Sequence, residues 1–303
     1  MEYIDLHTHS DFSDGAISPT GVIRKAKDAG LTTIALTDHD TINGLDEAEN
    51  TALKEKIDFI RGVEISAYND RFSNIHIVGL FLEDPNPIRS IQREIETRKS
   101  PYISDVCDCL SKKIDRDFSF ETIKAKLKGS VSLGTLSLLL AQERIYPSYV
   151  SAFSMLKDMK KTGELPNEPQ FRVPILQAIE QIHLAGGIAV LAHPCRLDKK
   201  VATFSGIKPF IDPIIDRGID AIEAFYPNQD CNYTKEVLDY ANKKDILVSG
   251  GSDFHGQKAE ALIGKYPDGS YIMENSRLRC LQNRALYYKQ KLNIQRQIHE
   301  KQR

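Results

Sequence analysis

The first apolar run of the chain ends in two histidines separated by one residue, His7-Thr8-His9. Alternate side chains of a β-strand point to the same side, so a strand that ends here directs both imidazoles to one place. Paired imidazoles are typical of metal sites. One His-x-His pair is weak evidence alone, and its weight depends on whether similar clusters follow other strands.

Predicted strands and helices alternate in two blocks of the sequence. Ser18-Pro19, for example, offers an N-cap and a first-turn proline, and Gly30 ends the helix that begins there. Strands are expected at residues 3–7, 32–37, 59–65, 75–82, 188–192, 219–225 and 246–249. Seven strands joined by crossovers favour a closed or nearly closed parallel α/β barrel. A doubly wound open sheet is less favoured, because no dinucleotide-binding glycine pattern follows the first strand.

Between the two blocks the pattern changes to helical segments rich in Lys, Glu and Ser. Helices are expected at 91–115, 120–127 and 133–144, followed by a linker at 166–174. We therefore predict three parts of the chain. They are a barrel formed by residues 1–90 and 175–270, a helical insertion at 91–174 that caps the substrate site, and a helical tail at 271–303.

Composition limits the function classes. A net charge of -2 gives no strong nonspecific attraction for nucleic acid or anionic membranes, so we expect neither a membrane nor a double-stranded DNA partner. Five cysteines without regular spacing suit reduced thiols. The sequence opens without a charged-then-apolar leader, and no apolar run approaches the ~18 residues that span a bilayer. A soluble, cytoplasmic protein of undetermined oligomeric state is predicted.

Candidate metal ligands recur at the ends of the predicted strands. Six of the 8 histidines fall there, whereas His183 lies inside a predicted helix and His299 in a charged tail. In β/α barrels the carboxyl ends of the strands form the active face, so these side chains should meet. The nine candidates are His7, His9, Asp14, His39, Glu64, His76, His193, Asp253 and His255.

The donor set restricts the metal and the chemistry. Nine donors are too many for one ion, because a catalytic zinc-like site uses three protein ligands and an open position. Imidazole and carboxylate donors without thiolate suit Mn²⁺, Zn²⁺ or Fe²⁺ better than Ca²⁺ or Mg²⁺. Clustered divalent ions are suited to phosphoester hydrolysis, since they generate hydroxide near neutral pH and bind phosphoryl oxygens.

Several motifs in order resemble those of the PHP (polymerase and histidinol phosphatase) phosphoesterases. The resemblance covers roughly residues 1–90 and 185–265 and implies a distorted seven-stranded barrel with a trinuclear metal centre. The matching motifs are His7-Thr-His9-Ser with Asp14-Gly15, Thr37-Asp38-His39-Asp40, Gly62-Val-Glu64, His76, Ala192-His193-Pro194 and Ser252-Asp253-Phe-His255.

The resemblance also implies how the nine candidates share three ions, for which we expect Mn²⁺, with Zn²⁺ or Fe²⁺ as alternatives. The first ion would be held by His7, His9, Glu64 and Asp253. Glu64 would bridge to a second ion, completed by His76 and His193. The third would be held by Asp14, His39 and His255.

Asp14 and the helical insertion resemble one branch of the family, the nucleoside 3',5'-bisphosphate phosphatases, which include enzymes that trim short RNA from the 5' end. Arg196 matches an arginine that follows the His-Pro motif and is a candidate for binding phosphate. The insertion departs from the branch, because Ser132-Leu-Gly134 replaces a segment that usually carries arginine and histidine. Arg144, Lys126 and Lys128 are candidate substitutes.

A metal-dependent phosphoesterase acting on a small phosphomonoester is therefore the leading hypothesis, with a nucleotide or a short RNA 5' end as substrate. Metal-bound hydroxide would attack phosphorus, and Asp40 or Asp253 would orient or transfer the proton. A cyclic-phosphate phosphodiesterase acting on a sugar or nucleotide is the alternative within this class. A noncatalytic, metal-stabilised scaffold is the alternative from another class.

Overall fold

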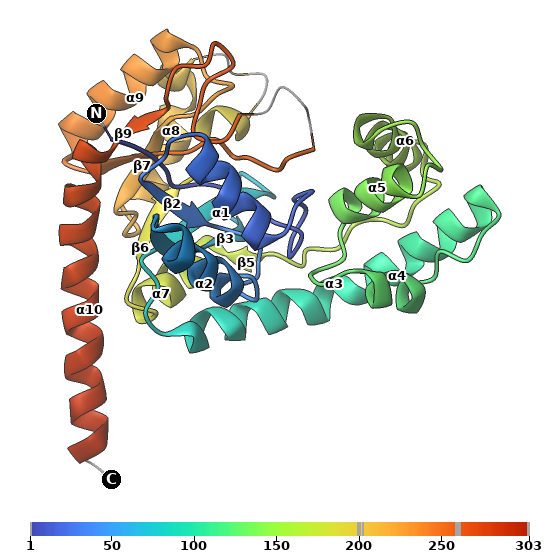
Figure 1. Cartoon of the computed structure of the whole chain (residues 1–303), viewed down its shortest axis with the longest axis horizontal. Helices are drawn as coiled ribbons and strands as arrows, with labels where there is room; N and C mark the ends of the chain where they lie inside the picture. Colours follow the sequence, from blue (N-terminus) through green and yellow to red (C-terminus); the bar gives the residue numbers. More distant parts are fainter. Residues whose placement is uncertain (1, 199–200, 202, 258–261, 302–303) are drawn as a thin grey trace.

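The core of the computed structural model is one mixed β-sheet that curls into a barrel (Figure 1). The structure describes residues 2–198, 201, 203–257 and 262–301, with side chains described as far as residue 297. Within these ranges the strands are β1 (Tyr3–Asp5), β2 (Thr33–Leu36), β3 (Asp58–Tyr68), β4 (Ile75–Leu80), β5 (Val173–Pro174), β6 (Ile188–Leu191), β7 (Ala221–Phe225), β8 (Leu247–Gly250) and β9 (Met273–Glu274).

The sheet differs from the expected seven-stranded parallel barrel in two ways. It has nine strands in the described part of the chain, because the two-residue strands β5 and β9 add to the seven expected ones. In addition, β4 runs antiparallel to both β3 and β6. Only residues 69–74 connect β3 to β4. A parallel crossover needs a dozen or more residues, so this short connection forces a hairpin.

The segments that follow β1 and β8 contact each other, which nearly closes the barrel. The path runs β8-β7-β6-β4-β3-β2-β1-β9, with β5 beside β3. The Leu6 amide donates to the Gly250 carbonyl at 3.3 Å, and the Asp253 amide donates to the His7 carbonyl at 2.9 Å. The residues on either side of this seam include four of the candidate metal ligands, so closure and site assembly depend on the same contacts.

Buried Asp5 holds the seam together. Its carboxylate accepts hydrogen bonds from the backbone amides of His7 (3.2 Å), Ser252 (2.9 Å) and Gly264 (2.8 Å), and from the Ser252 hydroxyl. One side chain thus satisfies donors on the segments that follow β1 and β8. Buried donors without acceptors are costly, so Asp5 stabilises the closed form of the barrel.

Strand residues alternate between the barrel interior and the surrounding helices. Val78 in β4 and Val190 in β6 face the interior cluster, whereas Ile77 and Leu191 join the cluster that packs against the outer helices. The helices around the barrel are α1 (Pro19–Asp28), α2 (Leu45–Glu55), α7 (Ile175–Leu184), α8 (Phe204–Ile215), α9 (Cys231–Lys244) and α10 (Leu278–Lys301), with short 3-10 turns η1 (Pro194–Arg196) and η2 (Asn275–Arg277).

The first turn of α10 closes the amino-terminal end of the barrel. Leu278 and Leu281 pack with Ile4 and Val190 in the interior cluster. Beyond this point α10 extends along the side of the molecule (Figure 1). No helix in the described ranges has the length and apolar character needed to cross a membrane.

Four helices between β4 and β5 project to one side of the barrel (Figure 1). They are α3 (Pro85–Ile114), α4 (Phe120–Lys126), α5 (Leu133–Gln142) and α6 (Tyr149–Thr162). They have their own hydrophobic cluster, in which Val106, Leu110, Leu136 and Leu156 are fully buried. We call α3 to α6 the helical insertion. The expected boundary at residue 91 falls inside α3, which therefore connects the insertion rigidly to the barrel.

We predict that Asp5→Ala weakens the fold by roughly 2–4 kcal/mol, because several buried donors lose their acceptor at once. Urea unfolding followed by circular dichroism measures this change. Exposed Asp28, at the end of α1, provides the control variant Asp28→Ala. A free energy of unfolding equal in the two variants would contradict a closing role for Asp5.

Candidate metal centre

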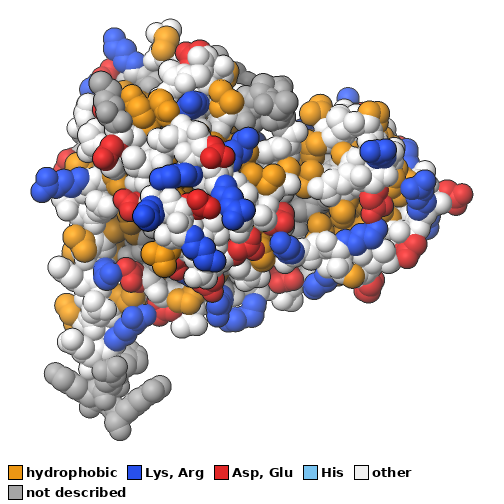
Figure 2. Space-filling model, viewed as in Figure 1, with side chains coloured by type: hydrophobic (Ala, Val, Ile, Leu, Met, Phe, Trp, Pro, Cys, Tyr) orange, Lys and Arg blue, Asp and Glu red, His pale blue; other side chains and the backbone are white. Residues whose placement is uncertain are grey.

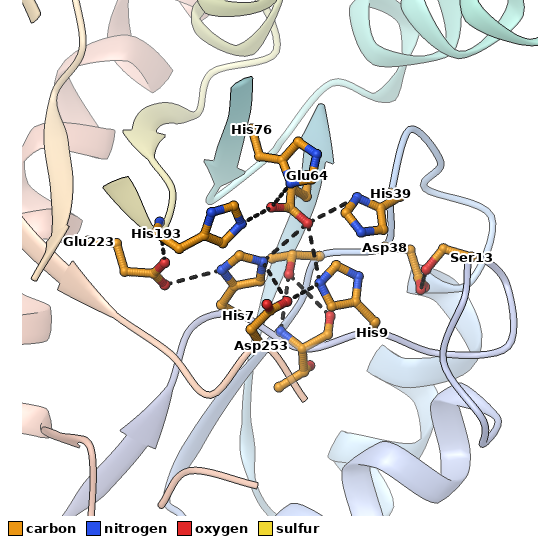
Figure 3. A network of polar contacts seen from close by, with 12 residues as sticks. His7, His9, Ser13, Asp38, His39, Glu64, His76, His193, Glu223 and Asp253 are labelled. Carbon is orange, nitrogen blue, oxygen red and sulfur yellow. Dashed lines mark hydrogen bonds and ion pairs between the residues drawn. The ribbon is translucent and has the colours of Figure 1, made fainter. Parts of the chain in front are cut away.

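The predicted metal ligands converge at the carboxyl end of the barrel (Figure 3). His7 and His9 follow β1, His39 follows β2, and His193 follows β6. His76 comes from the start of β4 rather than its end. Because β4 runs antiparallel, its start lies where the parallel strands end, and Ser66 of β3 is the register partner of His76.

Glu64 lies at the centre of the cluster and is fully buried. Each of its two carboxylate oxygens faces a different set of imidazoles (Figure 3). Oε1 lies 2.9 Å from His76 Nδ1 and 3.0 Å from His193 Nε2. Oε2 lies 3.2 Å from His7 Nε2, 3.3 Å from His9 Nε2 and 3.0 Å from His39 Nδ1.

Burial and neighbouring charge together set the pKa values of Glu64 and His9. Burial alone raises the pKa of the Glu64 carboxyl, but the imidazoles of His76, His39 and His7 hold this pKa well below its usual range. Burial, together with His255 and His39, lowers the pKa of His9 to about 3. At neutral pH Glu64 is therefore ionised and His9 is neutral, the forms of these two groups that bind metal.

The buried polar atoms fit bound cations. Buried side-chain atoms without a hydrogen-bond partner include His7 Nε2, His9 Nε2, Asp14 Oδ1, Glu64 Oε2 and His76 Nδ1. Unsatisfied buried polar atoms are costly, and here donor atoms of these residues lie within 4.8 Å of one another in sets. A divalent ion satisfies such atoms together, since each one is a metal-donor type.

Three sets of ligand atoms lie close enough to hold an ion, with all atoms of a set within 4.8 Å of one another. The set of His7, His9, Glu64 and Asp253 has the composition expected for the first ion. In the second set Glu64 and His76 are joined by His39, while His193 contacts Glu64 directly. In the third set Asp14, His39 and His255 are joined by His9. Every predicted ligand therefore lies in the cluster.

Asp253 and Arg196 form a pair at the edge of the cluster. Asp253 Oδ1 lies 3.2 Å from His9 Nε2, while Oδ2 accepts hydrogen bonds from Arg196 (2.7 Å) and from the Tyr226 hydroxyl (3.0 Å). About half of the Arg196 side chain stays exposed. Arg196 therefore positions Asp253 with one nitrogen and keeps other N–H groups for an anionic ligand.

The sequence analysis missed Glu223, a buried carboxylate in β7. Glu223 Oε1 lies 3.1 Å from His7 Nδ1, and Oε2 accepts the backbone amide of His193 at 2.6 Å. A carboxylate behind a ligand histidine fixes the orientation of the ring. The signal was present in the sequence, as an acidic residue in the middle of the apolar strand Ala221-Ile-Glu-Ala-Phe225.

Three of the eight non-glycine residues with a positive φ in the described part of the chain lie at the cluster. Asp40, His193 and Asp253 have positive φ angles of 55°, 25° and 51°. Positive φ angles are uncommon outside glycine, although aspartate and histidine adopt them more readily than most residues, and surrounding contacts hold them in place here. At Asp40, the backbone amide donates to the Glu64 carbonyl at 2.8 Å and Oδ1 accepts the Ser66 amide at 2.7 Å.

A cavity of about 270 Å³ opens between the cluster and the helical insertion. Asp14, His39, Asp40 and His76 line it on the barrel side. Arg144 does not line it and lies exposed after α5. The candidates Lys126 and Lys128 are also exposed, and they pair with Glu143 and Asp11. The cavity-lining cations from the insertion side are instead Lys99 and Arg172, which the sequence analysis did not select.

Comparison with known proteins identifies the class. The family model described as the PHP domain matches residues 5–162. A 5'-3' exoribonuclease of Haemophilus influenzae is 34% identical over 87% of this chain and 94% of that protein. A phosphoribosyl 1,2-cyclic phosphate 1,2-diphosphodiesterase of Eggerthella lenta is 26% identical over 84% of this chain and 94% of that protein. A 3',5'-nucleoside bisphosphate phosphatase of Chromobacterium violaceum is 30% identical over 84% of this chain and 88% of that protein.

These matches show that the chain belongs to the PHP domain family. Among solved structures, a metal-dependent phosphoesterase of Bifidobacterium adolescentis superposes with a TM-score of 0.78 at 23% sequence identity, covering 93% of this chain and 96% of that one. This likeness confirms the barrel-like α/β fold.

We predict that divalent ions stabilise the protein, because they replace unsatisfied contacts in a buried cluster. At 100 times the dissociation constant, a bound ion adds about 2.7 kcal/mol, which corresponds to a rise in Tm of roughly 5 °C or more. Thermal unfolding with EDTA and with Mn²⁺ measures the difference. An equal Tm under both conditions would contradict metal binding at the cluster.

We predict that Glu223→Gln lowers the affinity for Mn²⁺ by about 10- to 100-fold, because a neutral amide supports the His7 imidazole less well. Calorimetric titration of the EDTA-treated protein provides the dissociation constant. The matched control is Glu180→Gln, at an exposed position of α7. Unchanged affinity in Glu223→Gln would rule out the supporting role.

Proposed function

We propose that this PHP chain is a metal-dependent phosphomonoesterase that acts on a nucleotide or on the 5' end of a short RNA. The central observation is Glu64, whose two oxygens face five imidazoles beside an open cavity. An array of this kind suits several cations side by side. Exoribonuclease and bisphosphate phosphatase relatives support the substrate class.

Three divalent ions are proposed, with Mn²⁺ as the first choice and Zn²⁺ or Fe²⁺ as alternatives. The ligands proposed for the first ion are His7, His9, Glu64 and Asp253; for the second, Glu64, His76 and His193; and for the third, Asp14, His39 and His255. Ions bound there supply positive charge for phosphoryl oxygens and lower the pKa of water.

Residues around the cluster have distinct roles in this proposal. Arg196 binds phosphoryl oxygens with its remaining N–H groups, while its Nη1 keeps Asp253 in place. Asp40 lines the cavity, and the Ser66 amide orients its carboxylate. It is therefore suited to deliver the proton to the leaving oxygen. Asp253, held by Arg196 and Tyr226, serves to orient the centre rather than to move a proton.

The surface favours a small or single-stranded substrate. On the face seen in Figure 2, Lys and Arg side chains are interspersed with Asp and Glu. The net charge of -2 agrees with this mixed pattern. Wide basic surfaces are typical of proteins that bind duplex nucleic acid. Recognition in this chain is therefore assigned to the cavity, which the aromatic side chains of Tyr149, Phe153 and Phe171 also line.

We predict that the Mn²⁺-loaded protein hydrolyses adenosine 5'-monophosphate, adenosine 3',5'-bisphosphate or RNA with a 5' phosphate, with release of inorganic phosphate as the measurement. The variant carrying both His9→Ala and Glu64→Ala should lose at least about 1,000-fold in kcat/KM, because two ion sites lose ligands. Glu180→Gln is the control. Undiminished turnover by the double variant would contradict the assignment.

A cyclic sugar phosphate belongs in the same panel. The diphosphodiesterase relative aligns over most of this chain, and the insertion lacks the arginine and histidine usual in the bisphosphate branch. Turnover of the cyclic diester alone would replace the monoesterase proposal with a phosphodiesterase on the same metal centre.

A further inference from the structure

The turn that carries Asp14 is held by a buried carboxylate from the neighbouring strand end. Asp38 follows β2, and its side chain is buried. Its Oδ1 accepts the Ser10 amide at 2.7 Å and the Ser13 hydroxyl at 2.6 Å, while its Oδ2 accepts the Ser10 hydroxyl at 2.6 Å. Asp38 and Ser13 lie together beside the imidazoles (Figure 3). One carboxylate thus anchors the turn at two residues.

Hydrogen bonds within the turn determine where Asp14 lies. The Ser10 carbonyl accepts the Ser13 amide at 3.0 Å and the Gly15 amide at 2.9 Å. Asp14 stands between Ser13 and Gly15, and its Oδ1 lies 3.1 Å from His255 Nε2. The direction of the Asp14 carboxylate therefore depends on how firmly the turn is held.

The backbone of Asp38 is joined to the centre of the metal site. Its carbonyl accepts the Glu64 amide at 3.1 Å. The next residue is His39, whose Nδ1 lies 3.0 Å from Glu64 Oε2 and whose Nε2 lies 3.8 Å from Asp14 Oδ1. Asp38 is thus connected to Glu64 by a backbone hydrogen bond, to His39 by the chain, and to Asp14 through the turn. It connects three ligands without being a ligand itself.

The helical insertion contacts the barrel at the same turn. The Ser130 amide donates to the Phe12 carbonyl at 3.2 Å. An added Cβ at Gly129 would lie 1.8 Å from that carbonyl oxygen, so only glycine permits this approach of the two backbones. An added Cβ at Gly134 would lie 3.0 Å from Asp14 Cβ. Movement of the turn would therefore displace a metal ligand and the insertion together.

We propose that Asp38 is a positioning residue, which holds residues 10–15 in the form that binds the third ion and supports the insertion. The inference rests on the proposed function. Hydrogen bonds to an ionised carboxylate are stronger than those between neutral groups, and here three of them hold one short turn. Without them Asp14 has more positions available, and ordering it reduces the affinity for the ion.

The effect of Asp38 should be confined to one ion, because the first ion has supports of its own. Glu223 contacts the His7 ring, and Asp5 accepts the amide of Ser252, which precedes Asp253. Loss of the Asp38 carboxylate leaves these contacts in place. One ion should therefore bind more weakly while the remaining ions keep their affinity.

Metal binding tests this role without any turnover. The EDTA-treated protein is titrated with Mn²⁺ by calorimetry, and bound Mn²⁺ is counted after equilibrium dialysis. In Asp38→Ala one ion should bind about 10- to 100-fold more weakly, as for other residues that orient ligands. Asp38→Asn should stay within about 3-fold of the wild type, because its amide oxygen still accepts from Ser10 and Ser13 and its NH₂ group donates to the Ser10 hydroxyl. Thr51→Ala, which removes a buried hydroxyl from α2, is the control for lost stability alone.

Two outcomes of the titration would overturn the positioning role. One is Mn²⁺ binding by Asp38→Ala that equals the wild type. The other is an equal loss in Asp38→Asn and Asp38→Ala, since the negative charge rather than the hydrogen bonds would then be responsible. If Asp38→Ala does not fold, Ser13→Ala removes one of the three hydrogen bonds and should weaken the same ion by roughly 3- to 10-fold. Unchanged affinity in that variant would then overturn the role.

Hydrogen exchange tests the contact with the insertion. In Asp38→Ala the Ser130 amide should exchange at least about 10-fold faster than in the wild type, whereas the amides of Val106 and Leu110, in the insertion's own cluster, keep their protection. Unchanged exchange at Ser130, or an equal increase at all three amides, would contradict the local support. A protein that shows the expected Mn²⁺ and exchange differences but hydrolyses no phosphoester would overturn the proposed function alone.

Discussion

The carboxylate of Glu64 is the group on which the rest of the site depends. It is fully buried and contacts five imidazoles from four separate segments of the chain. An isolated carboxylate at this depth is strongly destabilised, and the surrounding histidines lower its pKa instead. Such an arrangement of donors is tolerated because cations bind in it. Grouping these buried polar side chains lowers the stability of the metal-free fold, and bound cations restore it.

Barrel closure and site assembly rely on the same short segments. Asp5 joins the segment after β1 to the segment after β8, and these segments carry His7, His9 and Asp253. Glu223 connects β7 to these segments, because its carboxylate contacts the His7 ring and accepts the backbone amide of His193. The strained backbone at His193 and Asp253 persists because these contacts restrain it. A change at the seam therefore alters ligand geometry as well as stability.

The sequence predicted much of this centre, because ligand type and strand ends are local signals. His7, His39 and Glu64 were identifiable from their position after apolar runs. The sequence analysis missed the antiparallel direction of β4, although residues 66–74, which separate the two expected strands, are too few for a parallel crossover. It also left β5 and β9 unrecognised, because strands of two residues have no periodicity. Lys99 was missed for a similar reason, since its environment depends on tertiary packing against Ser130 and Phe12.

The helical insertion has a hydrophobic cluster of its own, yet it contacts the site through polar groups at a few points. Lys99 extends from α3, and Arg172 follows the insertion and reaches His76 through Asn74. The first half of α3 nevertheless belongs to the barrel, because Ile88, Ile91 and Ile95 join the cluster that packs around the sheet. Further along the same helix, Val106 and Leu110 pack within the insertion. The cavity therefore lies where the two packing units meet, and its lining residues on α3 are held by a helix that both units share.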